Sequence, residues 1–136
     1  MPITYTIDAD AGLIMARPTG TLTTEETLEY FSRLVSDPDC PDSGIEIVNF
    51  SGVSRFEFDY PRLSRITREY QFAKSAKRIP ATIFICTAES HYGIGRMLES
   101  LHETANPEHI VRLIKTHDEL DETIRELKSE IFPDSR

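Results

Sequence analysis

Residues 79–88 read Ile-Pro-Ala-Thr-Ile-Phe-Ile-Cys-Thr-Ala, and this almost unbroken apolar run decides the fold class. A strand that is apolar on both faces is typical of a parallel sheet with helices packed on either side. Similar apolar runs end near Arg17, Phe50 and Lys115, and each leads into a stretch with helical spacing. This alternation predicts an α/β fold with largely parallel strands, because sheet and helices must bury each other's apolar faces.

The N-terminal segment predicts a β-hairpin. Residues 3–8 alternate between apolar and polar side chains, as a half-buried strand does, and residues 13–16 supply the returning strand. Gly12 between them suits a turn that needs a positive φ. With a further strand at 44–50, we expect a single-layer mixed, mainly parallel sheet that begins with this hairpin and continues in βα units.

Four helix starts carry capping residues. Thr23 and Thr116 are each followed three residues later by glutamate, which is the spacing of a capping box. Ser90 is the expected cap of a third helix, and Asp59 or Tyr60 caps the helix that starts near Pro61. The remaining loops include residues 18–23 and residues 51–59, the latter either a short edge strand or an aromatic-anchored loop. The expected caps are Thr23, Asp59 or Tyr60, Ser90 and Thr116.

The 136 residues match one domain, which we expect to span residues 1–132, with residues 133–136 as a C-terminal tail. No apolar run approaches the roughly 20 residues that cross a bilayer, and the first residues lack the basic-then-apolar pattern of a secretory signal. We therefore expect a cytoplasmic protein. Cys40 and Cys86 lie in dissimilar surroundings, a Pro/Asp-rich loop and an apolar strand, which predicts two free thiols.

The charge distribution predicts a protein partner. The formal net charge of −8 argues against nucleic-acid binding, because phosphates repel an acidic surface. Between residues 61 and 80, however, six basic residues stand against one acid, so this segment carries +5 and the rest of the chain −13. It is either a solvated helix face or a docking surface for an acidic partner, an anionic membrane surface or a second copy of the chain. We favour a homodimer, with partner-binding residues Arg62, Arg65, Arg68, Tyr70 and Phe72.

Ligands of open α/β sheets bind at the carboxyl edge of the strands, so the loops after each strand are the predicted site. Helix N-termini at this edge could attract an anion or a small polar molecule, although their hydroxyl groups also serve as ordinary helix caps. The predicted ligand-binding residues are Ser51, Phe56, Phe58, Tyr60, Thr87, Ser90, His91 and Tyr92.

No motif predicts catalysis, a metal or a cofactor. Cys86 and Ser51 have no base at a recognisable spacing, and the Walker and GxSxG patterns are absent from the sequence. His102 and His109 stand near acidic residues but without the spacing of a zinc site. Gly93 and Gly95 fall in the first turns of a helix, where they indicate close approach of either a ligand or a neighbouring element.

The stretch 45–53, Ile-Glu-Ile-Val-Asn-Phe-Ser-Gly-Val, resembles the central strand and following turn of the STAS-like family of anti-sigma-factor antagonists. The order of elements over residues 3–127 also resembles that family, especially its divergent bacterial relatives called SpoIIAA-like. This resemblance implies a SpoIIAA-like α/β domain with a binding or regulatory role. In phosphoregulated members an Asp-Ser-Ser/Thr-Gly segment carries the phosphorylated hydroxyl. Residues 59–62 here read Asp-Tyr-Pro-Arg, so the phosphorylation switch is not carried over.

These observations rank three functions. First is a non-enzymatic binding or regulatory module that acts through protein–protein contacts. The alternative is a carrier of a small apolar or anionic ligand, a lipid or a metabolite, held under the strand-end loops, and an enzyme ranks last. A large pocket beneath the aromatic segment at residues 53–60 favours the carrier, whereas a flat edge with a symmetric interface favours the interaction module.

Overall fold

The apolar run at 79–88 forms an interior strand of a five-stranded sheet in the computed structural model, which describes residues 3–59, 61–66, 68, 79–105 and 108–132. The first strand pairs antiparallel with the second, and all the others pair in parallel. The predicted mixed, mainly parallel sheet with an N-terminal hairpin is therefore confirmed. In spatial order the strands are β1 (Thr4–Asp8), β2 (Leu13–Arg17), β4 (Ile45–Asn49), β6 (Ala81–Ile85) and β7 (Ile110–Ile114).

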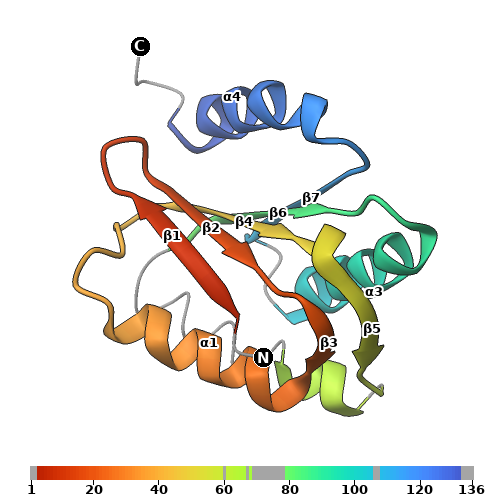
Figure 1. Cartoon of the computed structure of the whole chain (residues 1–136). Coiled ribbons are helices and arrows are strands. Elements are labelled where there is room, and N and C mark those ends of the chain that lie inside the picture. Colours follow the sequence, from red (N-terminus) through yellow and green to blue (C-terminus); the bar gives the residue numbers. More distant parts are fainter. Residues whose placement is uncertain (1–2, 60, 67, 69–78, 106–107, 133–136) are drawn as a thin grey trace.

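Helices cover both faces of this sheet, as an apolar β6 requires. Helix α4 (Leu120–Ile131) lies on one face, and α1 (Thr24–Ser36) and α3 (Glu89–Ala105) lie on the other (Figure 1). Side chains of β4 and β6 alternate between the two layers: Ile47 and Ile83 pack toward Leu127 of α4, whereas Val48 and Phe84 join the core on the side of α1. Within the described residues, no helix is both long enough and apolar enough to cross a membrane.

A second, two-stranded parallel sheet corrects the prediction of a loop at residues 18–23. Strand β3 (Gly20–Thr23) pairs with β5 (Val53–Glu57), and the two lie side by side next to the larger sheet (Figure 1). The segment at 51–59, for which the sequence allowed either a strand or an aromatic-anchored loop, thus contains a strand, β5. Pairing with a partner about thirty residues further along stabilises β3, and no local pattern signals such a contact.

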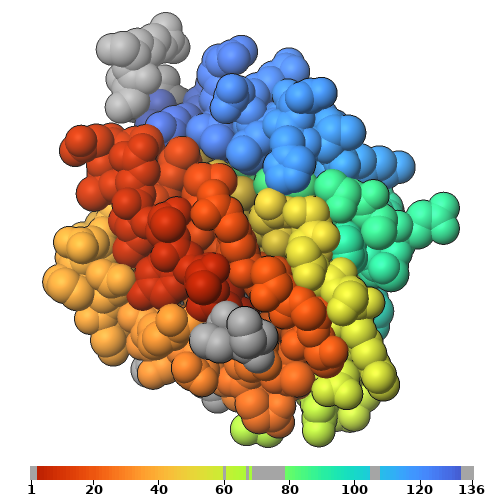
Figure 2. All heavy atoms as spheres, in the orientation of Figure 1, coloured from red at the N-terminus to blue at the C-terminus, as the bar shows by residue number. Residues whose placement is uncertain are grey.

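Helix α1 begins and ends as its sequence predicts. The Thr23 hydroxyl accepts a hydrogen bond from Glu26 N at 3.2 Å, and Asp37 N donates to Leu34 O at the other end. The inward face buries Tyr30, Phe31 and Leu34 against the sheet. Figure 2 shows this helix below the N-terminal hairpin, with α4 above it.

The cap of α3 corrects a second prediction. Ala88 O, not Ser90, accepts the first helical hydrogen bond, from Tyr92 N at 3.1 Å, so Ser90 lies within the first turn and is exposed. The His91 ring reaches back and its Nδ1 accepts from Ala88 N at 3.3 Å. The His91 side chain therefore makes the bond to the cap residue's N–H that glutamate makes in a capping box, and no Ser90 hydroxyl caps this helix.

The start of the last helical segment follows the prediction closely. Thr116 and Glu119 form a capping box around the short 3₁₀ turn η2 (His117–Glu119), which runs into α4. The Glu119 carboxylate accepts from the backbone N–H groups of Lys115 and Thr116, both at 3.0 Å. These bonds to the charged form lower the pKa of Glu119.

The two glycines of α3 have different surroundings, which settles the choice between ligand approach and packing for one of them. A Cβ added at Gly95 would lie 3.0 Å from Leu113 Cδ2 and 3.1 Å from Cys86 Sγ, so this position lets the helix approach the sheet closely. A Cβ added at Gly93 would meet no atom within 4 Å.

We expect Gly93→Ala to raise the free energy of unfolding by about 1 kcal/mol, because alanine is the better helix former. Gly95→Ala gains the same preference but must displace Leu113 and Cys86, at a cost of about 1–3 kcal/mol. Urea denaturation of both variants should therefore rank Gly93→Ala above Gly95→Ala. Equal stabilities would contradict the packing role of Gly95.

Candidate functional site

The carboxyl ends of the parallel strands share one edge of the sheet. Strands β2, β4, β6 and β7 all run in the same direction, so the segments that follow Arg17, Asn49, Ile85 and Ile114 meet there. This arrangement places the segments after these four strands at one edge, so their side chains can be compared as one surface. It does not by itself create a binding site, so each residue must be located individually.

An aromatic cluster closes the middle of this edge. The Phe50 ring centroid lies 5.2 Å from Phe56 and 5.3 Å from Phe84, and Phe58 lies 5.8 Å from Phe56. The cavity beneath these rings, on the inner side of the sheet, measures only about 40 Å³. Pockets for drug-sized ligands measure roughly 300–1,000 Å³, so the described part of this segment, with Phe58, leaves no room for such a ligand.

His91 belongs to the same cluster and joins α3 to β5. Its Nδ1 accepts from Ala88 N, so the ring proton is on Nε2, which donates to Val53 O at 2.8 Å. The ring is buried and lies 6.0 Å from Phe56. Both ring nitrogens are thus engaged in holding the helix start against the second sheet.

A shallow cleft of about 410 Å³ lies beside this cluster, between the start of α3 and the end of β7. Thr87, Tyr92 and Lys115 line it, and the Lys115 ammonium lies 4.9 Å from the centroid of the Tyr92 ring. Cys86 also lines the cleft, where burial raises the pKa of its thiol to about 12. A thiol that stays protonated is a poor nucleophile.

The eight predicted ligand-binding residues therefore fall into separate groups. Phe56, Phe58 and His91 lie in the aromatic cluster, whereas Thr87 and Tyr92 line the cleft. The structure leaves Ser51 and Ser90 exposed, and the Ser51 hydroxyl donates to Asn49 Oδ1 at 2.6 Å. Tyr60 lies outside the described residues.

The predicted basic surface is described in part. Residues 61–66 and 68 are helical, and Asp59 caps them by accepting from Arg62 N at 2.9 Å, as one of the two cap predictions has it. Leu63 and Ile66 are buried. The side chains of Arg62, Arg65 and Arg68 are exposed, and Tyr70 and Phe72 lie outside the described residues.

A buried hydrogen-bonded network is the feature that the sequence prediction missed. The Tyr30 hydroxyl donates to Glu46 Oε2 at 2.6 Å, and the Thr82 hydroxyl donates to Glu46 Oε1 at 2.9 Å. Thr82 Oγ1 also lies 3.0 Å from His109 Nε2. A hydroxyl has a single proton, which here points to Glu46, so His109 Nε2–H is the donor in the last contact. The His102 ring packs 4.9 Å from that of His109.

The register of the sheet assembles this network. Glu46 of β4 lies opposite Thr82 of β6, so both side chains point to the layer of α1. Tyr30 of that helix reaches Glu46 with its hydroxyl group. Glu46, Thr82 and His102 are fully buried. Burial and the neighbouring Glu46 raise the pKa of Tyr30 well above its usual value. Within the described residues, no group of three or more histidine, cysteine or acidic side chains is placed to hold a metal ion.

Comparison with known proteins identifies the fold. The unphosphorylated form of the anti-sigma factor antagonist SpoIIAA matches 93% of this chain and 97% of its own, with a TM-score of 0.54 at 11% identity. The chain has a SpoIIAA-like fold. A second SpoIIAA-like structure, an uncharacterized protein of the DUF3478 family from Shewanella loihica PV-4, matches with a TM-score of 0.53 at 9% identity, over 90% of this chain and 91% of its own.

The similarity to these proteins is one of three-dimensional structure and does not extend to the sequence. No family model matches the sequence, and no curated protein matches it. The resemblance inferred from residues 45–53 and from the order of elements is therefore borne out at the level of the SpoIIAA-like fold.

We expect Tyr30→Phe to lower the free energy of unfolding at neutral pH by about 1–3 kcal/mol, because a buried carboxylate oxygen loses this donor. Tyr30 also makes the free energy of unfolding depend on pH in the alkaline range. Its pKa is raised in the folded state, so the unfolded chain loses this proton first, and stability falls as pH rises through about 10.

Urea denaturation at pH 7, 9 and 11 tests both effects. Tyr30→Phe should start lower but lose less stability between pH 9 and 11 than the wild type. Tyr92→Phe is the matched control, because Tyr92 lines the cleft beside Lys115, outside the network, and this variant should keep the wild-type fall in stability between pH 9 and 11. A wild-type stability that is flat across this range would contradict the buried, neutral state of Tyr30.

Proposed function

We propose that this chain is a non-enzymatic binding or regulatory module that acts through protein–protein contacts. The observation that carries the proposal is the closed aromatic cluster. Phe56 and Phe58 pack over Phe50 and leave a cavity of about 40 Å³, so the centre of the carboxyl edge presents a surface. Such a surface suits a macromolecular partner better than an enclosed small molecule.

The side chains with reactive potential support a binding role over catalysis. The Cys86 thiol is held protonated by burial, and the Ser51 hydroxyl donates to an amide oxygen of Asn49 and not to a base. Tyr30 and Glu46 are strongly polar, but they face a cavity too small for a substrate. Each of these groups is engaged in the structure of the protein itself.

The partner that we propose is acidic, and a second copy of the chain is the first choice. Arg65 and Arg68 stand exposed on a segment of charge +5, whereas the remaining chain carries −13. A symmetric dimer would match these opposite charges twice. The fold adds an analogy, since SpoIIAA is by its description an antagonist of a protein factor. Cys40 and Cys86 are both free thiols, which agrees with a cytoplasmic, reducing compartment.

The carrier remains the second candidate because of one observation, the cleft of about 410 Å³ that Thr87 and Tyr92 line. A small anion could lie there against the Lys115 ammonium. Native mass spectrometry of freshly purified protein tests this candidate: a retained small molecule supports it. The absence of both a retained molecule and any thermal shift with lipids or organic acids counts against it.

The proposed dimer predicts a salt-sensitive self-association. Sedimentation velocity at low and at high ionic strength should show a dimer that dissociates as salt screens the basic segment. We expect Arg65→Glu combined with Arg68→Glu to weaken the dimer about tenfold or more, which corresponds to about 1.4 kcal/mol.

The matched control reverses the same amount of charge elsewhere. Arg17→Glu combined with Arg125→Glu changes two exposed arginines outside the basic segment and should leave the dissociation constant nearly unchanged. A wild-type protein that sediments as a monomer at all concentrations and salt levels would rule out the homodimer. Equal weakening by both double variants would show a general charge effect without a specific surface.

A further inference from the structure

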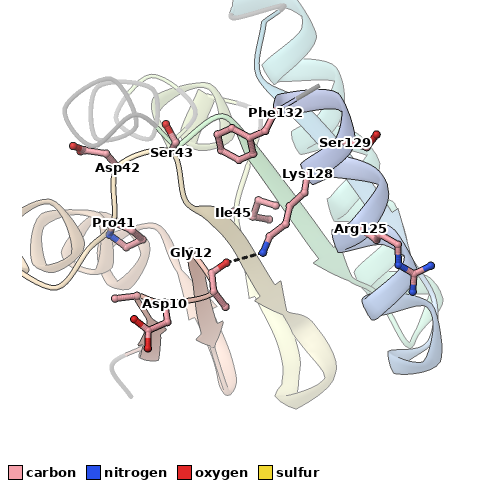
Figure 3. A pocket seen from close by; sticks show the side chains of 12 residues that line it. Asp10, Gly12, Pro41, Asp42, Ser43, Ile45, Arg125, Lys128, Ser129 and Phe132 are labelled. Carbon is pink, nitrogen blue, oxygen red and sulfur yellow. Dashed lines mark hydrogen bonds between the residues drawn. The ribbon is translucent and has the colours of Figure 1, made fainter. Parts of the chain in front are cut away.

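A cavity of about 750 Å³ lies at the opposite edge of the sheet, where β2 and β4 begin (Figure 3). Three segments enclose it: the β1–β2 turn at residues 9–12, the loop before β4 at residues 41–45, and the last turns of α4. Its volume falls within the range of roughly 300–1,000 Å³ that small-molecule sites occupy. The prediction of a ligand site addressed only the carboxyl edge, so this cavity is independent of it.

The walls of the cavity are fixed by the backbone. Gly12 has a φ of +69° in the turn, and its carbonyl accepts from Ile45 N at 2.9 Å, which ties the turn to β4. Ser43 adopts a φ of 61°, a left-handed conformation that is costly for a residue with a side chain. A Cβ at Gly44 would lie 2.9 Å from Pro41 Cγ, so the loop is also packed tightly. A preformed site loses little conformational freedom on binding.

Lys128 supplies the charge of this cavity. Its half-buried side chain extends from α4 across the space, and Nζ donates to Ala11 O at 2.8 Å (Figure 3). An ammonium group has three donors, and this one is directed to a neutral carbonyl. Among the described residues, no carboxylate forms an ion pair with Lys128. A partly desolvated cation with donors to spare attracts an anionic acceptor.

An apolar wall faces the same space. Phe132, at the end of α4, is 37% exposed and lines the cavity. Figure 3 shows its ring and the Ile45 side chain on the same side of the cavity as the stem of Lys128. Pro41 adds a further apolar surface. Together they can take up a ring or a branched chain.

Two acids restrict which anion can enter. Asp10, Asp42 and Arg125 line the cavity, but Figure 3 shows the Arg125 side chain directed away from Lys128, so the two cations do not meet at one point. A ligand with two or more negative charges would therefore meet repulsion from the rim that a single ammonium does not offset. The charge pattern selects a single carboxylate over phosphate or a dicarboxylate.

We infer that this cavity binds a small organic monocarboxylate with an apolar group, its carboxylate on Lys128 Nζ and its apolar part against Ile45, Pro41 and Phe132. The inference goes beyond the proposed interaction module and uses the other edge of the sheet. Failure of the dimer would leave it standing, and its own failure would leave the dimer standing.

The test uses 3-phenylpropionate as the probe, titrated into the full-length chain and followed by ¹⁵N–¹H NMR. We expect saturable shifts of the Gly12, Ser43 and Ser129 amide signals, with a Kd of about 1 mM or tighter. The neutral amide, 3-phenylpropanamide, should bind about tenfold more weakly because it cannot pair with the ammonium. Inorganic phosphate should not compete.

Variants assign the contacts. Lys128→Met keeps the apolar stem and should raise the Kd of 3-phenylpropionate about tenfold. Lys115→Met, at the opposite edge of the sheet, should leave this Kd unchanged. Phe132→Ala should raise the Kd of 3-phenylpropionate several-fold. If Lys128→Met does not fold, the Kd values of 3-phenylpropionate and 3-phenylpropanamide on the wild type still test whether the carboxylate pairs with the ammonium group.

Any of the following results would overturn the inference: no saturable shift at these three amides, equal binding of the acid and the amide, competition by inorganic phosphate, or unchanged binding by a folded Lys128→Met. Shifts confined to Thr87 and Tyr92 would also overturn it, and would place the ligand in the cleft at the carboxyl edge.

Discussion

The pairing of β4 with β6 is the constraint on which the rest of the structure depends. It sets Ile47 beside Ile83 on one face and Glu46 beside Thr82 on the other. The first pair builds the apolar layer under α4, and the second places a carboxylate in the interior, where it needs hydrogen-bond donors. Tyr30 supplies one of them from α1, so the position of that helix is tied to the register of the sheet. A shift by one residue would exchange the two faces and destroy both layers.

The two edges of the sheet then take different forms. At the carboxyl edge, Phe50, Phe56 and His91 fill the space beneath the second sheet, and what remains is a surface with a shallow cleft. At the amino edge, the turn and loop stand apart from the end of α4 and leave an open cavity crossed by Lys128. The same fold thus carries a closed aromatic cluster beside a shallow cleft at one edge and an open cavity at the other.

Sequence reasoning succeeded where the signal was local and failed where it was not. The apolar run at 79–88 and the capping residues Thr23 and Thr116 act within a few residues, so their patterns predicted the parallel strand and the two helix starts. Strand β3 depends on a partner about thirty residues away and left no pattern. The network around Glu46 was missed because its members are polar residues scattered through apolar strands; a glutamate and a threonine at interior positions of two neighbouring strands were the available signal.

The network around Glu46 has a direction. His109 donates to Thr82, Thr82 donates to Glu46, and Tyr30 donates to the other carboxylate oxygen, so every proton in the chain points toward the same acid. A glutamine in its place would have nearly the same shape but would offer one donor and one acceptor. One hydroxyl would then have to rotate, and a reversal at Thr82 would force the imidazole of His109 into its other tautomer. A substitution at this position therefore changes the hydrogen bonding of Tyr30 on α1, of Thr82 on β6 and of His109 before β7, although none of them is close to it in the sequence.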